Sequence, residues 1–127
     1  MAERVLKLLG REAEQFVSRF AVRTGSRIQI VLTDDIEWIG AAGDYAELHC
    51  RGKAQLVRET MRELEQKLDP AKFLRIHRSR IIRMDCTREL HAIENREYTI
   101  RLADGSQHRS SRTYADRLEE WLASGRG

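Results

Sequence analysis

The spacing of apolar residues changes along the chain, from near four to two. Over residues 2–20 apolar positions recur every three or four residues, at Val5, Leu9, Ala13, Phe16 and Phe20. This spacing predicts an amphipathic helix. Thr24-Gly25-Ser26 then breaks the pattern as a linker would. From residue 27 onwards the period is two, which indicates β-strands.

Short alternating runs separated by glycine turns predict a meander of antiparallel hairpins. The expected strands cover residues 27–32, 35–41, 45–50, 53–57, 73–77, 80–84, 87–93, 97–102 and 106–110. Asp104-Gly105 is the strongest hairpin signal in the chain. The predicted fold class is therefore mainly β, with small antiparallel sheets of short strands.

Two short helices are predicted besides the N-terminal one. The internal helix spans about residues 59–68, and Thr60 and Glu63 have the spacing of a capping box at its start. The C-terminal helix lies near residues 112–123, with Ser111 as its expected N-cap. Both helices carry an apolar stripe that would pack them against the sheets.

The chain of 127 residues is long enough for one domain with one core. We expect an N-terminal helix and linker over residues 1–25, a β domain over residues 26–123, and a tail at residues 124–127. The apolar stripe of the N-terminal helix must be covered, either by its own domain or by a second copy. No run reaches the roughly 18 apolar residues of a membrane span, and no secretory signal is readable. A cytoplasmic protein without a membrane partner is expected.

Positive charge is concentrated in one segment. Lys and Arg number 23 against 20 Asp and Glu, a net charge of +3, and the 34% charged, 41% hydrophobic composition excludes a disordered chain. Residues 75–83 hold four arginines and no acid, whereas residues 58–69 hold three basic and four acidic residues. Contact with phosphates depends on such local clusters. On composition alone, a solvated loop that pairs with nearby glutamates is the alternative.

The other reactive side chains point to neither a metal site nor catalysis. Cys50 and Cys86 lie far apart, and the four histidines lack metal-ligand spacing, so free thiols and no cofactor are expected. A metal site assembled around His49 and Cys50 is the alternative. Ser79 lies two residues from His77, a spacing on a tight loop that rarely gives nucleophile–base geometry. We therefore expect that the protein is not an enzyme.

Three segments together resemble the LytTR-type DNA-binding domain. FLRIHRSRIIRMD at residues 73–85, preceded by ETMRELEQKLDP, looks like the signature of that family. DDIEWIGAAGDYAELHC at residues 34–50 is similar to its second and third strands and the loop between them. LADGSQHRSSRTYADRL at residues 102–118 resembles its terminal hairpin and last helical turn. The resemblance runs from about Arg27 to Leu122.

The resemblance implies a bacterial transcription regulator that binds promoter DNA through loops entering successive major grooves. It implies a homodimer on promoter repeats and, as in most family members, the C-terminal effector part of a two-component response regulator. The upstream receiver or sensor domain would then lie outside this chain, which we interpret as an excised effector domain. In the alternative function, the chain is a protein-interaction or dimerisation module whose basic loop meets an acidic partner.

The resemblance also implies which residues contact double-stranded DNA. The three corresponding loops are Gly43-Asp44-Tyr45, His77-Arg78-Ser79-Arg80, and Ser111-Arg112 with Arg109. Base-edge contacts fall to Arg78 and Arg112. Phosphate contacts fall to His77, Ser79, Arg80 and Arg109. Tyr45 is equally open to packing within its loop or to touching DNA.

At three places the chain departs from the family's pattern. The family commonly has Asn where this chain has Asp44, and usually Asn where it has Arg83. His108-Arg109 stands where an apolar or proline pair is usual. We expect the changes at Arg83 and at His108-Arg109 to add positive charge and to favour binding of the DNA backbone.

Overall fold

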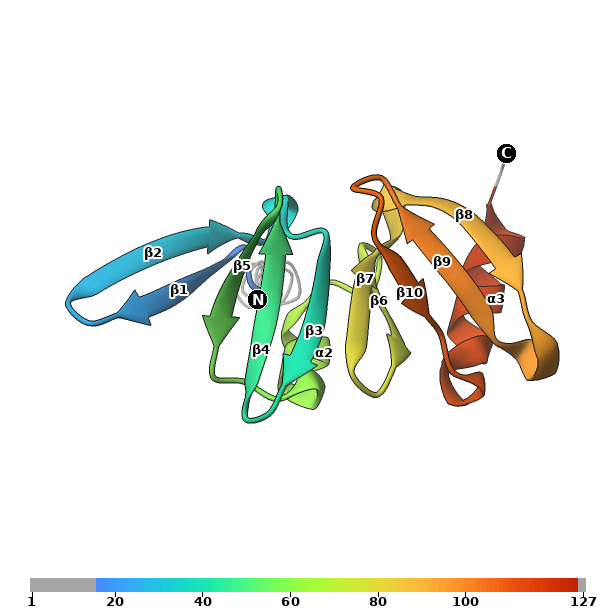
Figure 1. The fold of residues 1–127 in the computed structure, drawn as a ribbon, viewed down its shortest axis with the longest axis horizontal. Coiled ribbons are helices and arrows are strands. Elements are labelled where there is room, and N and C mark those ends of the chain that lie inside the picture. Colours follow the sequence, from blue (N-terminus) through green and yellow to red (C-terminus); the bar gives the residue numbers. More distant parts are fainter. Residues whose placement is uncertain (1–15, 126–127) are drawn as a thin grey trace, which may run out of the picture.

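The computed structural model describes residues 16–125, and within them three antiparallel sheets follow one another along the long axis (Figure 1). The strands are β1 (Arg19–Thr24), β2 (Arg27–Leu32), β3 (Trp38–Ala42), β4 (Tyr45–Cys50), β5 (Lys53–Val57), β6 (Phe73–His77), β7 (Arg80–Arg83), β8 (Thr87–Ala92), β9 (Tyr98–Leu102) and β10 (Gln107–Arg109). The helices are α2 (Met61–Lys67) and α3 (Ala115–Ser124). Short 3-10 turns are η1 (Thr33–Asp35), η2 (Met84–Cys86), η3 (Glu94–Arg96) and η4 (Arg112–Tyr114).

The sheets contain two, five and three strands, in the orders β1-β2, β5-β4-β3-β7-β6 and β10-β9-β8. The predicted mainly β fold class is confirmed. The Asp104-Gly105 hairpin is also confirmed, because β9 and β10 pair antiparallel across it. At the start of α2, the Thr60 hydroxyl accepts from the Glu63 N–H, and the Glu63 carboxylate accepts from the Thr60 N–H, so the predicted capping box is present.

The expected extension of the N-terminal helix to residue 20 is wrong. Arg19–Thr24 is strand β1, and the supposed linker around Gly25 is the turn of the β1–β2 hairpin, with Gly25 at a φ of +63°. Phe20 lies four positions after Phe16, and this even spacing fits one face of a strand as well as one face of a helix. The rest of the predicted helix, residues 1–15, lies outside the described residues.

The expected N-cap of the C-terminal helix is also wrong. Helix α3 begins at Ala115 after the 3-10 turn η4, so Tyr114 occupies the N-cap position and has no side-chain cap hydrogen bond. The backbone of Ser111 is used instead, since its N–H bonds to another strand. None of the helices in residues 16–125 is long and apolar enough to cross a membrane.

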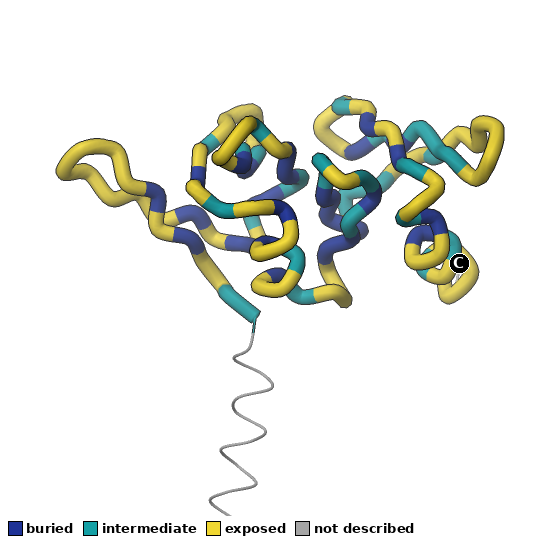
Figure 2. Tube along the Cα trace, turned by 90° about the horizontal axis from the view of Figure 1, so that it is seen from below, coloured by how far each residue is buried: buried dark blue, intermediate teal, exposed yellow. Residues whose placement is uncertain are grey.

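Two apolar clusters form the core, and the β6–β7 hairpin contributes to both. Phe73 and Ile81 belong to the first cluster, with β3, β4, α2 and the inner face of the β1–β2 hairpin. Leu74, Ile76 and Ile82 belong to the second cluster, with β9 and α3. The alternation of side chains along a strand sends neighbours to opposite faces, so Phe73 faces the first cluster while Leu74 and Ile76 face the second. These contacts hold the β6–β7 hairpin at the middle of the molecule. The β1–β2 hairpin instead extends from one end of the molecule, and its tip is exposed (Figure 2).

Candidate nucleic-acid interface

The three loops expected to contact DNA lie next to one another along one edge of the sheets (Figure 1). Two backbone hydrogen bonds join them. The Ala41 N–H donates to the Ser79 carbonyl over 3.0 Å and ties the first loop to the second. The Ser111 N–H donates to the Ile76 carbonyl over 2.8 Å and ties the third loop to the second. Residues far apart in the sequence therefore form one continuous edge.

Arg75 holds the β6–β7 turn in shape. Its Nη2 donates to the Arg78 carbonyl over 2.8 Å, and its Nε donates to the His77 carbonyl over 3.3 Å. The guanidinium also lies 5.1 Å from the centre of the Tyr114 ring, a cation–π distance. Arg75 therefore fixes the backbone of the β6–β7 turn through the His77 and Arg78 carbonyls.

His77 and Ser79 bond to each other across the turn. The Ser79 N–H donates to His77 Nδ1 over 3.1 Å, and the Ser79 hydroxyl lies 2.9 Å from the same nitrogen. Because a backbone N–H can only donate, Nδ1 is the acceptor and the ring proton is on Nε2. Burial and the charges of Arg78 and Arg80 lower the pKa of His77. His77 is therefore a neutral side chain that offers one N–H donor, and the hydroxyl of Ser79 is already engaged.

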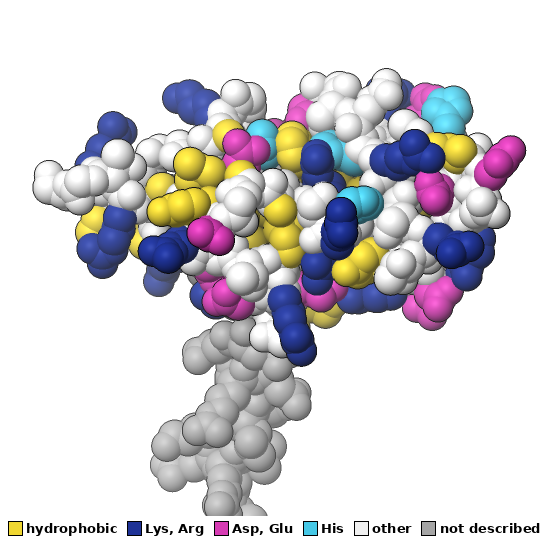
Figure 3. Space-filling view, turned by 60° about the horizontal axis from the view of Figure 1, so that its bottom comes forward, with side chains coloured by type: hydrophobic (Ala, Val, Ile, Leu, Met, Phe, Trp, Pro, Cys, Tyr) yellow, Lys and Arg dark blue, Asp and Glu magenta, His cyan; other side chains and the backbone are white. Residues whose placement is uncertain are grey.

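Among the basic residues of the three loops, Arg78 and Arg112 are the available cations. Both are exposed, and neither has an ion-pair partner within residues 16–125. Arg109 is exposed too, but its guanidinium bonds Glu97 through Nε at 3.1 Å and Nη2 at 2.9 Å. Such a surface pair contributes little stability, so Arg109 can exchange its carboxylate for a phosphate. Lys and Arg side chains are interspersed with acidic ones on this face (Figure 3).

The structure places Arg80 at the seam between the five-stranded and three-stranded sheets. Its Nη1 donates to His108 Nδ1 over 2.9 Å, and its guanidinium lies 4.6 Å from the centre of the Trp38 ring. Half-burial lowers the pKa of Arg80. The guanidinium of Arg80, on β7, thus contacts Trp38 on β3 and His108 on β10, whereas that of Arg78 is exposed.

The expectation that His108 adds positive charge is wrong. Its side chain is 3% exposed, and burial, followed by the charge of Arg80, lowers its pKa to about 4. Because Arg80 donates to Nδ1, the ring proton is on Nε2 and is shared with the Ser106 hydroxyl at 2.7 Å. That hydroxyl in turn donates to Asp104 over 2.5 Å. His108 is a neutral, buried link in a chain of hydrogen bonds that runs from Arg80 to Asp104 at the surface.

Arg83 does not add positive charge to the edge formed by the three loops either. Only 6% of it is exposed, and its guanidinium lies 4.6 Å from the centre of the Phe73 ring. Its Nε donates to the Ile36 carbonyl over 2.7 Å, and its Nη2 donates to the Thr33 carbonyl. The arginine therefore satisfies carbonyls of the segment that leads into β3, and the expectation of a backbone-binding cation is wrong.

Folding should become less favourable in acid because of His108. Its pKa of about 4 in the folded state lies below the ordinary value of 6.5, so between these values the unfolded chain binds more protons. Stability from this residue is present above pH 6.5 and is lost as the pH falls, by about 1 kcal/mol per pH unit near pH 5. Urea unfolding from pH 7 to pH 4.5 measures it. The His108→Gln variant, which does not titrate there, should show a shallower decline, and an equal decline would contradict this account.

The first loop borders a hollow that the sequence analysis did not identify. Asp44 and Tyr45 are exposed at its rim, and Tyr45 retains 44% of its surface. Arg58, between β5 and α2, and Arg62, on the first turn of α2, line the same hollow. The charges of residues 58–69 nearly cancel, so the charge distribution of the sequence does not point to these arginines. The capping spacing of Thr60 and Glu63 was the available signal, since a carboxylate used in a cap leaves neighbouring arginines unpaired.

No group of three or more His, Cys, Asp or Glu side chains suited to a metal ion occurs within residues 16–125. Cys50 and Cys86 are free and half-buried. Burial, followed by Asp35 and Glu37, raises the pKa of the Cys50 thiol to about 11. Its thiolate form, which is both the metal ligand and the nucleophile, is therefore disfavoured.

Comparison with known proteins agrees with this arrangement. The family model described as the LytTr DNA-binding domain matches residues 26–123. "Sensory transduction protein LytT" of Bacillus subtilis is 31% identical over 104 residues, covering 82% of this chain and 43% of that protein. Its namesake from Bacillus anthracis is 27% identical over 116 residues, covering 91% of this chain and 47% of that protein. The chain thus spans about half the length of these relatives.

A solved structure shares the fold. The LytTr DNA-binding domain of a methyl-accepting/DNA response regulator from Bacillus cereus superimposes with a TM-score of 0.75 at 17% sequence identity. The match covers 84% of this chain and 97% of that one. The overall fold of this chain is therefore one that this solved domain also adopts.

Proposed function

Since the chain belongs to the LytTr DNA-binding domain family, we propose that it recognises a specific promoter sequence through the edge where its three loops meet. The observation that carries the proposal is the placement of Arg78 and Arg112. These two arginines are exposed, have no ion-pair partner within the described residues 16–125, and lie on neighbouring loops joined by the hydrogen bond of 2.8 Å from Ser111 to Ile76. An arginine fork can bond the O6 and N7 atoms of guanine in the major groove.

The remaining loop residues would position the protein on the duplex. His77 offers its Nε2–H, and Arg109 can leave Glu97 for a phosphate. Such phosphate contacts fix register and orientation without reading sequence. We propose that two copies bind neighbouring half-sites on one face of the DNA. The names of the relatives support a further proposal, that this is the DNA-binding part of a sensory transduction regulator.

The proposal is tested by selecting bound duplexes from a random library at several salt concentrations and sequencing them. A repeated motif with half-sites about 10 base pairs apart is expected for a pair of copies on successive major grooves. Salt-sensitive binding without any motif would contradict sequence recognition and leave only a basic surface. Absence of binding at low salt would contradict DNA binding altogether and would favour a protein partner for the basic turn.

Arg78→Ala should weaken binding to the selected sequence by about 1–3 kcal/mol, which is roughly 5- to 150-fold, and relax base preference at one position. The reason is that Arg78 supplies a base-edge contact, whereas its backbone carbonyl, which Arg75 binds, survives the substitution. Fluorescence anisotropy on selected and scrambled duplexes measures both effects. Arg88→Ala, which removes an exposed arginine on β8, is the control. Equal losses on both duplexes would contradict the assignment to a base edge.

A further inference from the structure

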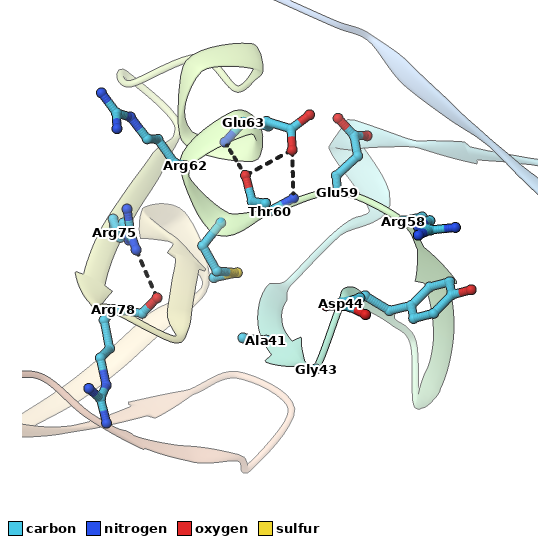
Figure 4. Close-up of a pocket in the computed structure, with 12 residues that line it drawn as sticks. Ala41, Gly43, Asp44, Arg58, Glu59, Thr60, Arg62, Glu63, Arg75 and Arg78 are labelled. Carbon is cyan, nitrogen blue, oxygen red and sulfur yellow. Dashed lines mark hydrogen bonds between the residues drawn. The ribbon is translucent and has the colours of Figure 1, made fainter.

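A hollow of about 580 Å³ adjoins the turn that carries Arg78. The β3–β4 turn forms one wall, the β6–β7 turn forms another, and the segment between β5 and α2 closes it (Figure 4). Arg58 lies on the side of Asp44, whereas Arg75 and Arg78 lie on the opposite side, and Arg62 lies on the first turn of α2 (Figure 4). Four arginines thus surround this hollow.

Two of the acidic side chains at the hollow are already engaged. The Glu63 carboxylate accepts from the Thr60 N–H over 3.1 Å and from the Thr60 hydroxyl over 2.9 Å, and these bonds lower the pKa of Glu63. Glu59 forms an ion pair with Lys67. Asp44 is exposed on the rim, and no ion pair between it and an arginine is found within residues 16–125. The acids therefore do not neutralise the arginines of the same segment.

Arg58 and Arg62 are free to bind something outside the domain. Both are exposed, and no ion pair involving either is found within residues 16–125. Arg75 differs, because its guanidinium bonds the β6–β7 turn and Glu65. The side chains of Arg58, Arg62 and Arg78 spread to different sides of the hollow and do not converge (Figure 4). This spread suits separate phosphates along a strand better than one small anion.

We propose that Arg58 and Arg62 form a second phosphate-binding site, which extends the DNA contact beyond the three loops along the backbone of the bound duplex. The inference rests on the proposed function and deepens it. The planar guanidinium group presents parallel N–H donors that match phosphate oxygens. Phosphate contacts carry no base information, so this site adds affinity and fixes register without changing the sequence that is read.

The Arg58→Ala/Arg62→Ala variant should lower the salt dependence of binding by about two units on a log–log plot, because each phosphate contact contributes about 0.9. When salt rises from 50 to 200 mM, the affinity of the unmodified chain falls by some factor, and the factor for the variant should be roughly 10 times smaller. The selected motif should stay the same. Anisotropy titrations on the selected duplex at four salt concentrations measure the slope, and the library selection checks the motif.

Lys53→Ala/Arg88→Ala is the matched control, since it removes the same charge from two exposed residues. Strands β4 and β7 both run away from the loop edge, so Lys53, beyond the end of β4, and Arg88, beyond the end of β7, lie at the opposite edge. The slope of the control should stay near that of the unmodified chain. If both double variants share one slope while the Arg78→Ala variant still loses base preference, the second phosphate site is wrong and the proposed function stands. If the unmodified chain selects no motif, the proposed function itself fails.

Discussion

Replacing Arg83 by methionine should lower the free energy of unfolding by about 2–4 kcal/mol and leave the salt dependence of DNA binding unchanged. The substitution removes the donors to the Ile36 and Thr33 carbonyls, and a buried acceptor without a partner costs about 1–3 kcal/mol. Methionine retains part of the contact with Phe73, which limits the loss from packing. Urea unfolding followed by circular dichroism measures the stability, and anisotropy titrations measure the salt dependence.

Arg88→Met provides the comparison, because Arg88 is an exposed arginine five positions further along the chain. Surface substitutions of this kind usually change stability by less than about 0.5 kcal/mol. Both variants lose one positive charge, so a difference between them reports burial and hydrogen bonding alone. A stable Arg83→Met protein with a reduced salt slope would show that Arg83 reaches DNA and would contradict the position described above.

The β6–β7 segment shows what the sequence could and could not predict. Its alternation predicted two strands, because a strand's period is local, and in the structure Leu74 and Ile76 face the same apolar cluster. The exposure and the hydrogen-bond partners of its arginines could not be predicted in this way. Arg78 is exposed, whereas Arg80 bonds His108 and Arg83 bonds the carbonyls near β3. These partners lie 28 and 47 residues away, and no local pattern reveals them.

The candidate site, too, could be predicted from the sequence only in part. The resemblance indicated the three loops, and the structure shows the backbone bonds from Ala41 to Ser79 and from Ser111 to Ile76 that hold them together. The sequence did not indicate Arg58 and Arg62, because the charges of residues 58–69 nearly cancel. Charge balance in the sequence says little about which side chains pair, since Glu63 is used by the helix cap and not by its arginine neighbours.

Ile76→Ala should lower the free energy of unfolding by about 2–5 kcal/mol. Ile76 is fully buried in the second apolar cluster, between the β6–β7 hairpin and the elements β9 and α3. Truncation loses the apolar burial and leaves a cavity that the packed surroundings fill only in part. Ile30→Ala is the matched control, because Ile30 is also a strand residue but is 55% exposed on β2. Equal destabilisation of the two variants would contradict the assignment of Ile76 to the core.

The same variant separates the core from the DNA-binding edge. The Ile76 carbonyl, which accepts from the Ser111 N–H, is retained after truncation, and no group assigned to DNA is removed. The apparent Kd for DNA should therefore rise only by the factor one over the folded fraction, because only the folded protein binds DNA. Anisotropy in conditions where unfolding is independently measured makes this correction. A loss that persists after the correction would mean that the packing beneath the turn sets the distance between Arg78 and Arg112, so that the core would determine which bases the edge can reach.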